Sequence, residues 1–153
     1  MPISDELRQR AVSASVDGEP GDVVAFLRLA TDPEELHVFV EHWNYDSGGA
    51  ELIAVMEHPA CDLATALMAF WRSGPLWHLK HEHREDVPSW ELESFDFAKA
   101  VEALILAKSD WRTGIAYDPS SDAGIDWTQE YLERAGGRRL PEPLYKPTPL
   151  GAV

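Results

Sequence analysis

Short apolar stripes with the spacing of an α-helix recur along most of this chain, and residues that start or stop a helix bound each of them. The clearest start is Asp32, which is followed by proline at the first helical position and by glutamate at the third. Leu36, Phe39, Val40 and Trp43 then fall at positions i, i+3, i+4 and i+7, so they share one face. This pattern predicts a helix over residues 33–44.

The same signals predict a series of further helices. Ser4, Asp62, Ser94 and Asp126 each precede an apolar stripe and can cap a helix N-terminus with a side-chain oxygen. Glycine and proline close several of the stripes, as Gly74 and the proline after it do. The expected helices cover residues 4–14, 22–30, 33–44, 50–57, 62–73, 94–110 and 126–135.

These elements predict an all-α fold of six to seven short helices. Helices of this length, joined by short turns, pack as a compact bundle or as a small solenoid-like stack of helical hairpins. Residues 76–93 alternate only partly between apolar and polar, so we expect either a short strand or a loop there.

The chain length of 153 residues suits one domain. We expect a single helical domain over residues 1–137 and a proline-rich tail over residues 138–153. Such a tail favours an extended, polyproline-II-like path. It either packs across the domain through Leu140, Leu144 and Tyr145 or stays loose.

Acidic residues outnumber basic ones widely, and they are unevenly spread. Asp and Glu total 27 against 13 Lys and Arg, which gives a formal net charge of −14. Residues 1–60 alone hold 12 acids and three bases. Such a field repels nucleic acid and anionic membranes and attracts basic partners, and no Lys/Arg cluster offers a phosphate-binding surface. We therefore expect no direct nucleic-acid or membrane binding, although an acidic surface also promotes solubility.

The sequence favours a cytoplasmic location. Cys61 is the single cysteine, so a disulfide within the chain is impossible, which fits a reducing compartment. The N-terminal residues include Asp5 and Glu6 and lack the apolar run of a signal peptide. The longest apolar run, residues 66–71, is far too short to cross a bilayer.

Four short motifs occur in order between residues 36 and 71. They are Leu36-His37, the segment from Asn44 to Gly48, the segment from His58 to Leu67, and Phe70-Trp71. In this order and spacing, the chain resembles a bacterial family known as domain of unknown function 4274, over residues 36–118. Tyr45 stands where the family pattern more often has tryptophan. The resemblance implies a helical bacterial domain without an established activity, and related small acidic domains resemble immunity proteins of bacterial toxin systems.

The leading functional expectation is an immunity or inhibitor protein that binds a basic toxin or effector. Exposed acids would speed the encounter with a basic partner, and aromatic side chains would anchor the complex. A nucleic-acid-mimic inhibitor is an alternative that rests on the same excess of acidic residues. A protein that assembles with itself is a further alternative. The predicted binding residues are Glu34, Glu35, Glu41, Trp43, Tyr45, Asp46, Glu51 and Glu57.

A small metal-binding or hydrolytic enzyme is the alternative from another class. Its best metal ligands would be His78, His81 and His83. A helix or a strand places only two of these three on one face, and the spacing matches zinc sites poorly. Further candidates for such a site are His37 and His58, with Asp46.

Two motifs have both a functional and a structural interpretation. Asn44 and Asp46 can present polar groups beside His37, but residues of these types in a turn commonly bond their own backbone. Cys61 lies near His58 and just ahead of a helix, where the pKa of a thiol is often lowered. Cysteine is nevertheless among the most buried residue types. Phosphate loops, dinucleotide fingerprints and hydrolase elbows are missing from the sequence, so we expect no cofactor.

Overall fold

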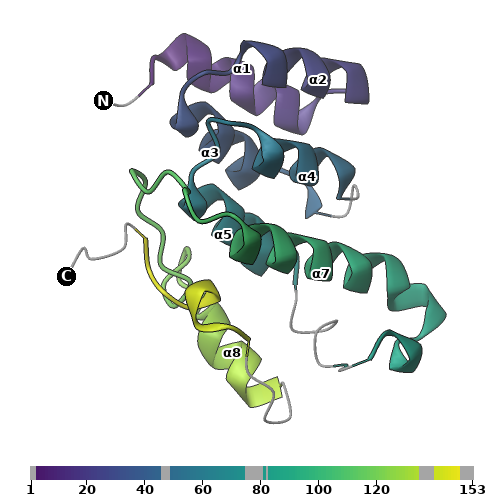
Figure 1. Ribbon diagram of the computed structural model, residues 1–153. Coiled ribbons are helices and arrows are strands. Elements are labelled where there is room, and N and C mark those ends of the chain that lie inside the picture. The colour runs from purple at the N-terminus through teal and green to yellow at the C-terminus, as the bar shows by residue number, and fades with distance from the viewer. Residues whose placement is uncertain (1–2, 46–48, 75–80, 82, 135–139, 149–153) are drawn as a thin grey trace.

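The helices of the computed structural model lie as successive layers, stacked one on the next (Figure 1). The structure describes residues 3–45, 49–74, 81, 83–134 and 140–148. The predicted mostly α fold is confirmed. The α-helices are α1 (Asp5–Val16), α2 (Pro20–Leu29), α3 (Pro33–His42), α4 (Ala50–Glu57), α5 (Leu63–Arg72), α7 (Leu92–Ala107) and α8 (Trp127–Arg134), and the short 3-10 turns are η2 (Arg84–Asp86), η3 (Ser89–Glu91) and η4 (Glu142–Leu144).

The stacking order follows the chain. Helices α1 and α2 form the first layer, α3 and α4 the second, and α5 with α7 the third (Figure 1). Helix α1 packs on α3 and α3 on α5, while α2 packs on α4. Phe26, Phe39 and Trp43 join the first two layers as a stack of rings, with centroid distances of 5.3 and 5.4 Å. Each helix thus buries its apolar stripe against the neighbouring layer, as in a short solenoid.

Local capping signals explain most helix starts. The side chains of Ser4, Asp32, Asp62 and Asp126 each accept a backbone N–H from the first turn of the helix that follows, at 2.9 to 3.2 Å. The prediction that Ser94 caps the long helix is wrong. The 3-10 turn η3 runs directly into α7, so that helix begins two residues before Ser94.

The C-terminal segment packs on the domain through residue 148. Leu140 and Leu144 are buried, and the indole Nε1 of Trp71 donates to the Leu144 carbonyl at 2.8 Å. Tyr117 and Thr148 exchange a pair of backbone hydrogen bonds, each 2.8 Å long. Of the two expectations for the tail, residues 140–148 therefore follow the packed one.

The described part of residues 76–93 forms turns as far as residue 91, and α7 begins at Leu92. Residues 84–86 and 89–91 are the 3-10 turns η2 and η3, and no strand occurs among the residues that the structure describes. None of the described helices is long and apolar enough to cross a membrane.

Candidate functional site

An open pocket of about 380 Å³ lies where the ends of α3 and α5 meet the start of α8. Residues from three separate parts of the chain form its walls. Three of the lining residues, Glu41, Trp43 and Tyr45, belong to the predicted binding set. Its lining residues are Glu41, Trp43, Tyr45, Arg72, Asp122, Ala123, Ile125 and Trp127.

The Asp122 carboxylate organises this pocket. Arg72 donates to it through Nε at 2.9 Å and through Nη2 at 2.7 Å, which is a bidentate ion pair. The Tyr117 hydroxyl and the Trp127 indole N–H each donate to the same carboxylate at 3.0 Å. A third Arg72 nitrogen, Nη1, donates to the Glu41 carbonyl at 3.2 Å. The hub thus ties the end of α5 to the end of α3 and to the start of α8.

The hydrogen bonds of this hub shift the ionisation of its members. Burial alone would raise the pKa of Asp122, which is only 6% exposed, but the bonds from Arg72, Trp127 and Tyr117 outweigh burial and lower it. The pKa of Tyr117 is raised by burial and by the nearby Asp122 charge. Arg72 and Asp122 are therefore both ionised at neutral pH, so the Asp122 charge offsets the charge of Arg72.

A tight turn next to the hub contains a strained residue. Asp122 and Ile125 exchange two backbone hydrogen bonds of 2.9 Å, which leaves Ala123 and Gly124 as the two turn residues. Both have positive φ, 50° at Ala123 and 86° at Gly124, as type I′ turns require. Alanine adopts this conformation at a cost because its Cβ crowds the backbone. The turn holds Ile125 exposed at the pocket.

The two predicted aromatic residues line the pocket and are packed into the domain. Trp43 is 9% exposed and stacks on Phe39, and its indole Nε1 is buried without a hydrogen-bond partner in the described part of the chain. Tyr45 is half-buried, and its hydroxyl donates to the Val40 carbonyl at 3.1 Å. Burial raises the pKa of Tyr45. Trp43 therefore contributes part of its ring to the pocket, while its indole N–H is closed off from a bound molecule.

One of the predicted acids is internal. Glu35 is 1% exposed, so the expectation that it lies on the surface is wrong. Its carboxylate pairs with Arg10 and accepts the backbone N–H groups of Thr31 and Asp32 at 3.1 Å each. Burial would raise the pKa of Glu35, but these bonds and the Arg10 charge outweigh burial and lower it. Glu35 is thus a capping and core residue.

The other predicted acids are spread over two helices. Glu41 and Glu57 are exposed, and Glu34 and Glu51 are half-buried. Only Glu41 among them lines the aromatic pocket. Asp46 lies outside the described residues.

The histidine of the first family-like motif is half-buried beside a threonine. His37 Nδ1 lies 2.9 Å from Thr65 Oγ1, and Thr65 is fully buried. Burial lowers the pKa of His37, against the opposing effect of the Glu41, Glu34 and Asp62 carboxylates. A fully buried hydroxyl cannot reach a substrate, so this pair holds α3 against α5.

Asp62 has a second structural role besides capping α5. Its Oδ2 accepts the backbone N–H groups of Gly114 and Ile115 at 2.7 and 3.2 Å. The N–H of Leu63 donates to the Arg112 carbonyl at 2.8 Å. This single carboxylate thus fixes the loop after α7 to the start of α5.

The motif from His58 to Asp62 holds a turn. His58 Nδ1 accepts the Ala60 N–H at 3.0 Å, which leaves Nε2 as the donor to the Leu27 carbonyl at 2.8 Å. Cys61 is fully buried, and burial raises its pKa to about 12. A thiol with that pKa is protonated at neutral pH, so Cys61 is not an activated nucleophile.

The histidine cluster is only partly described. His81 Nε2 lies 3.4 Å from a Glu91 carboxylate oxygen, and His83 is exposed. His78 lies outside the described residues. No group of three or more His, Cys, Asp and Glu side chains in the described part of the chain is arranged to hold a metal ion.

Sequence reasoning missed five of the eight residues that line the pocket. It did not single out Arg72, Asp122, Ile125 or Trp127, because their contacts join residues 50 or more positions apart or depend on the unexpected turn. The Gly124 that follows Ala123 was the available local signal for a tight turn at this place.

Comparison with known proteins gives one match. The family model described as Domain of unknown function (DUF4274) matches residues 31–106, a span that includes Glu41, Trp43, Tyr45 and Arg72. Asp122 and Trp127 lie beyond it. No curated protein and no solved structure matches the chain. The match confirms the resemblance found in the sequence, and the chain belongs to the DUF4274 family.

Proposed function

We propose that this protein is an acidic protein-binding module that receives a basic side chain of a protein partner in the pocket around Arg72 and Asp122. The observation that carries the proposal is the composition of that pocket. It combines aromatic walls, an exposed carboxylate and an arginine whose charge is already paired. We further propose that the module is a cytoplasmic inhibitor or immunity protein and that its partner is a basic toxin or effector.

The charges of the pocket favour a cation. Arg72 and Asp122 offset one another, which leaves the Glu41 carboxylate as the excess charge. Trp43 and Trp127 supply aromatic rings at the same place, and a lysine or arginine over such a ring gains a cation–π attraction.

The field around the pocket supports capture of a basic partner at long range. Among the 12 acids of residues 1–60, Glu35 is the only one that forms an ion pair in the described structure. The exposed carboxylates therefore keep their negative potential, which speeds association with a basic surface and weakens as salt rises. The exposed acids of this segment are Asp5, Glu6, Asp17, Glu19, Asp22, Glu41 and Glu57.

Two charge-reversal variants separate the pocket from the general field. Glu41→Arg changes a pocket residue, and Glu57→Arg makes the same charge change at an exposed position on α4 outside the pocket. Each immobilised variant is compared with the unaltered protein for capture from a lysate of the source organism, read by mass spectrometry. We expect a basic protein that is retained by the Glu57 variant and lost from the Glu41 variant.

Two results would count against the proposal. Equal capture by both variants would show that the pocket has no role, and loss of capture from both would show that only the general field matters. The immunity role needs a separate test, in which expression of the captured protein inhibits growth and co-expression of this chain restores it.

A further inference from the structure

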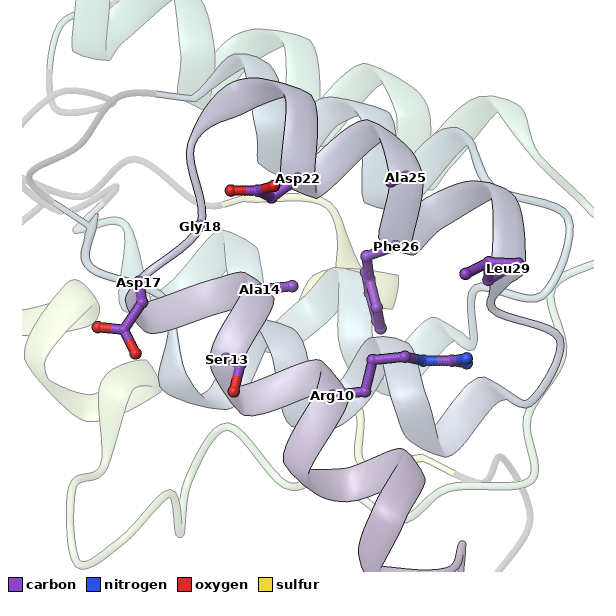
Figure 2. Close-up of a pocket in the computed structure, with 9 residues that line it drawn as sticks. All are labelled: Arg10, Ser13, Ala14, Asp17, Gly18, Asp22, Ala25, Phe26 and Leu29. Carbon is purple, nitrogen blue, oxygen red and sulfur yellow. The ribbon is translucent and has the colours of Figure 1, made fainter.

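The first layer of the stack carries a second recognition feature, a groove between α1 and α2 (Figure 2). Its volume is about 390 Å³, and its floor is formed by Ala14 and Phe26. Figure 2 shows Asp17 and Asp22 at the end beside the α1–α2 turn, and Arg10 and Leu29 at the other end. None of these residues lines the pocket around Arg72 and Asp122.

The outer side of this layer lacks the cover that the inner layers have. Helix α1 packs on α3 and α2 on α4, so the hairpin has a neighbouring layer on one side only (Figure 1). Large apolar side chains are exposed on it, with Val16 59%, Val24 48% and Leu29 61% exposed. Three of the six large exposed apolar residues of the described chain thus lie on this one hairpin. Leu29 is the one of these three that lines the groove, so the groove itself has exposed apolar surface of the kind found at interaction sites.

The charges of the groove differ between its two ends. The Arg10 guanidinium is paired with the buried Glu35, so that end is neutralised. Asp17 and Asp22 are exposed, and neither forms an ion pair with a basic side chain in the described part of the structure. The groove therefore selects an occupant that is apolar along most of its length and positively charged at one end.

The shape of the groove suits a helix. Two packed helices present ridges and a groove into which a third helix fits. A second copy of the chain is a poor occupant because two molecules that each carry a net charge of −14 repel one another. We propose that the α1–α2 groove binds an amphipathic helix of a basic protein partner, with lysine or arginine of that helix placed against Asp17 and Asp22.

A pair of synthetic helices tests this chemistry directly. Each is capped at both ends and about 18 residues long, or roughly five turns, with leucines on one face and alanine elsewhere. One probe carries lysines in a terminal turn, and the other carries glutamates there. Binding to the full chain is followed by the backbone amide signals of the ¹⁵N-labelled protein. We expect saturable shifts within residues 10–29 and at least ten-fold tighter binding of the lysine probe.

Matched variants distinguish the groove from non-specific attraction. Ala25 is exposed and lines the groove, so Ala25→Trp fills it, while Ala100→Trp makes the same change at an exposed site on α7. We expect Ala25→Trp to weaken the lysine probe at least ten-fold and Ala100→Trp to leave it unchanged. The double change Asp17→Asn with Asp22→Asn should remove the preference for lysine over glutamate.

Several outcomes would overturn the inference. They are the lack of a saturable shift with the lysine probe, equal binding of both probes, shifts centred outside the first layer, and full binding by the Ala25 variant. The inference does not depend on the pocket around Arg72 and Asp122, because Glu41→Arg should leave the amide shifts in the groove intact. Loss of pocket binding and loss of groove binding are therefore separate results.

Discussion

The substitution Asp122→Asn tests whether one buried carboxylate organises the pocket. Asp122 accepts two hydrogen bonds from Arg72 and one each from Tyr117 and Trp127. In an asparagine whose nitrogen takes the place of Oδ1, the amide group faces one donor, Arg72 Nη2, while Arg72 Nε, the Tyr117 hydroxyl and the Trp127 indole keep a neutral acceptor. Because the substitution loses one charged hydrogen bond and leaves the guanidinium without its counter-charge, the expected loss of stability is about 3 kcal/mol.

The assay is urea unfolding at neutral pH, followed by tryptophan fluorescence, with thermal unfolding as a second measure. For a chain of this size, a loss of about 3 kcal/mol lowers the Tm by about 6 to 12 °C. Asp96→Asn is the matched control because the pair of Arg84 and Asp96, 3.0 Å apart, is exposed on both sides, and we expect no measurable change from it. A loss below about 1 kcal/mol in Asp122→Asn would refute the assigned role.

The contribution of Asp122 to folding stability depends on pH in a direction that follows from its pKa. The pKa of Asp122 is lower in the folded chain than its unfolded value of about 3.9. Its stabilising contribution is therefore complete well above pH 4 and is lost as the pH falls through the folded pKa. The difference in stability between the unaltered protein and Asp122→Asn should shrink in acid, and a difference that grows below pH 4 would contradict this sign.

Three further substitutions test local features, each by its unfolding free energy. Ala123→Gly relieves the positive φ and should raise stability by about 0.5 to 1 kcal/mol, and a decrease would show that the turn is unstrained there. His58→Ala removes the bonds to the Leu27 carbonyl and the Ala60 N–H and should cost about 1 to 2 kcal/mol, so an unchanged unfolding curve would mean that the turn holds without it. Gly49→Ala places a Cβ against the Phe97 ring and should cost about 1 to 3 kcal/mol, a loss that a second change, Phe97→Ala, should partly reverse.

Local chemistry made most of the fold predictable. The caps at Ser4, Asp32, Asp62 and Asp126 act within three residues of the atoms they bond, so a reader of the sequence can find them. Ser94 misled the prediction because a 3-10 turn that began earlier had already started the helix.

The site was less predictable because its contacts are distant in the chain. Arg72 and Asp122 meet across 50 positions, and neither residue type signals a partner at that separation. As a glutamate, Glu35 was expected on the surface, but its place at the third position of α3 also predicts a capping role. The buried pair with Arg10, 25 positions earlier, shows that its position decided the outcome.

The most direct test of the pocket uses a short capped peptide with one arginine between glycines, and its glutamate counterpart. The indole N–H signals of Trp43 and Trp127 report binding by NMR. We expect saturable shifts with the arginine peptide, at a dissociation constant on the order of 10 mM for one cation–π contact and one ion pair. The response should disappear in Glu41→Arg and persist in Glu57→Arg. Equal shifts with the glutamate peptide, or a full response in the Glu41 variant, would contradict a basic side chain as the occupant.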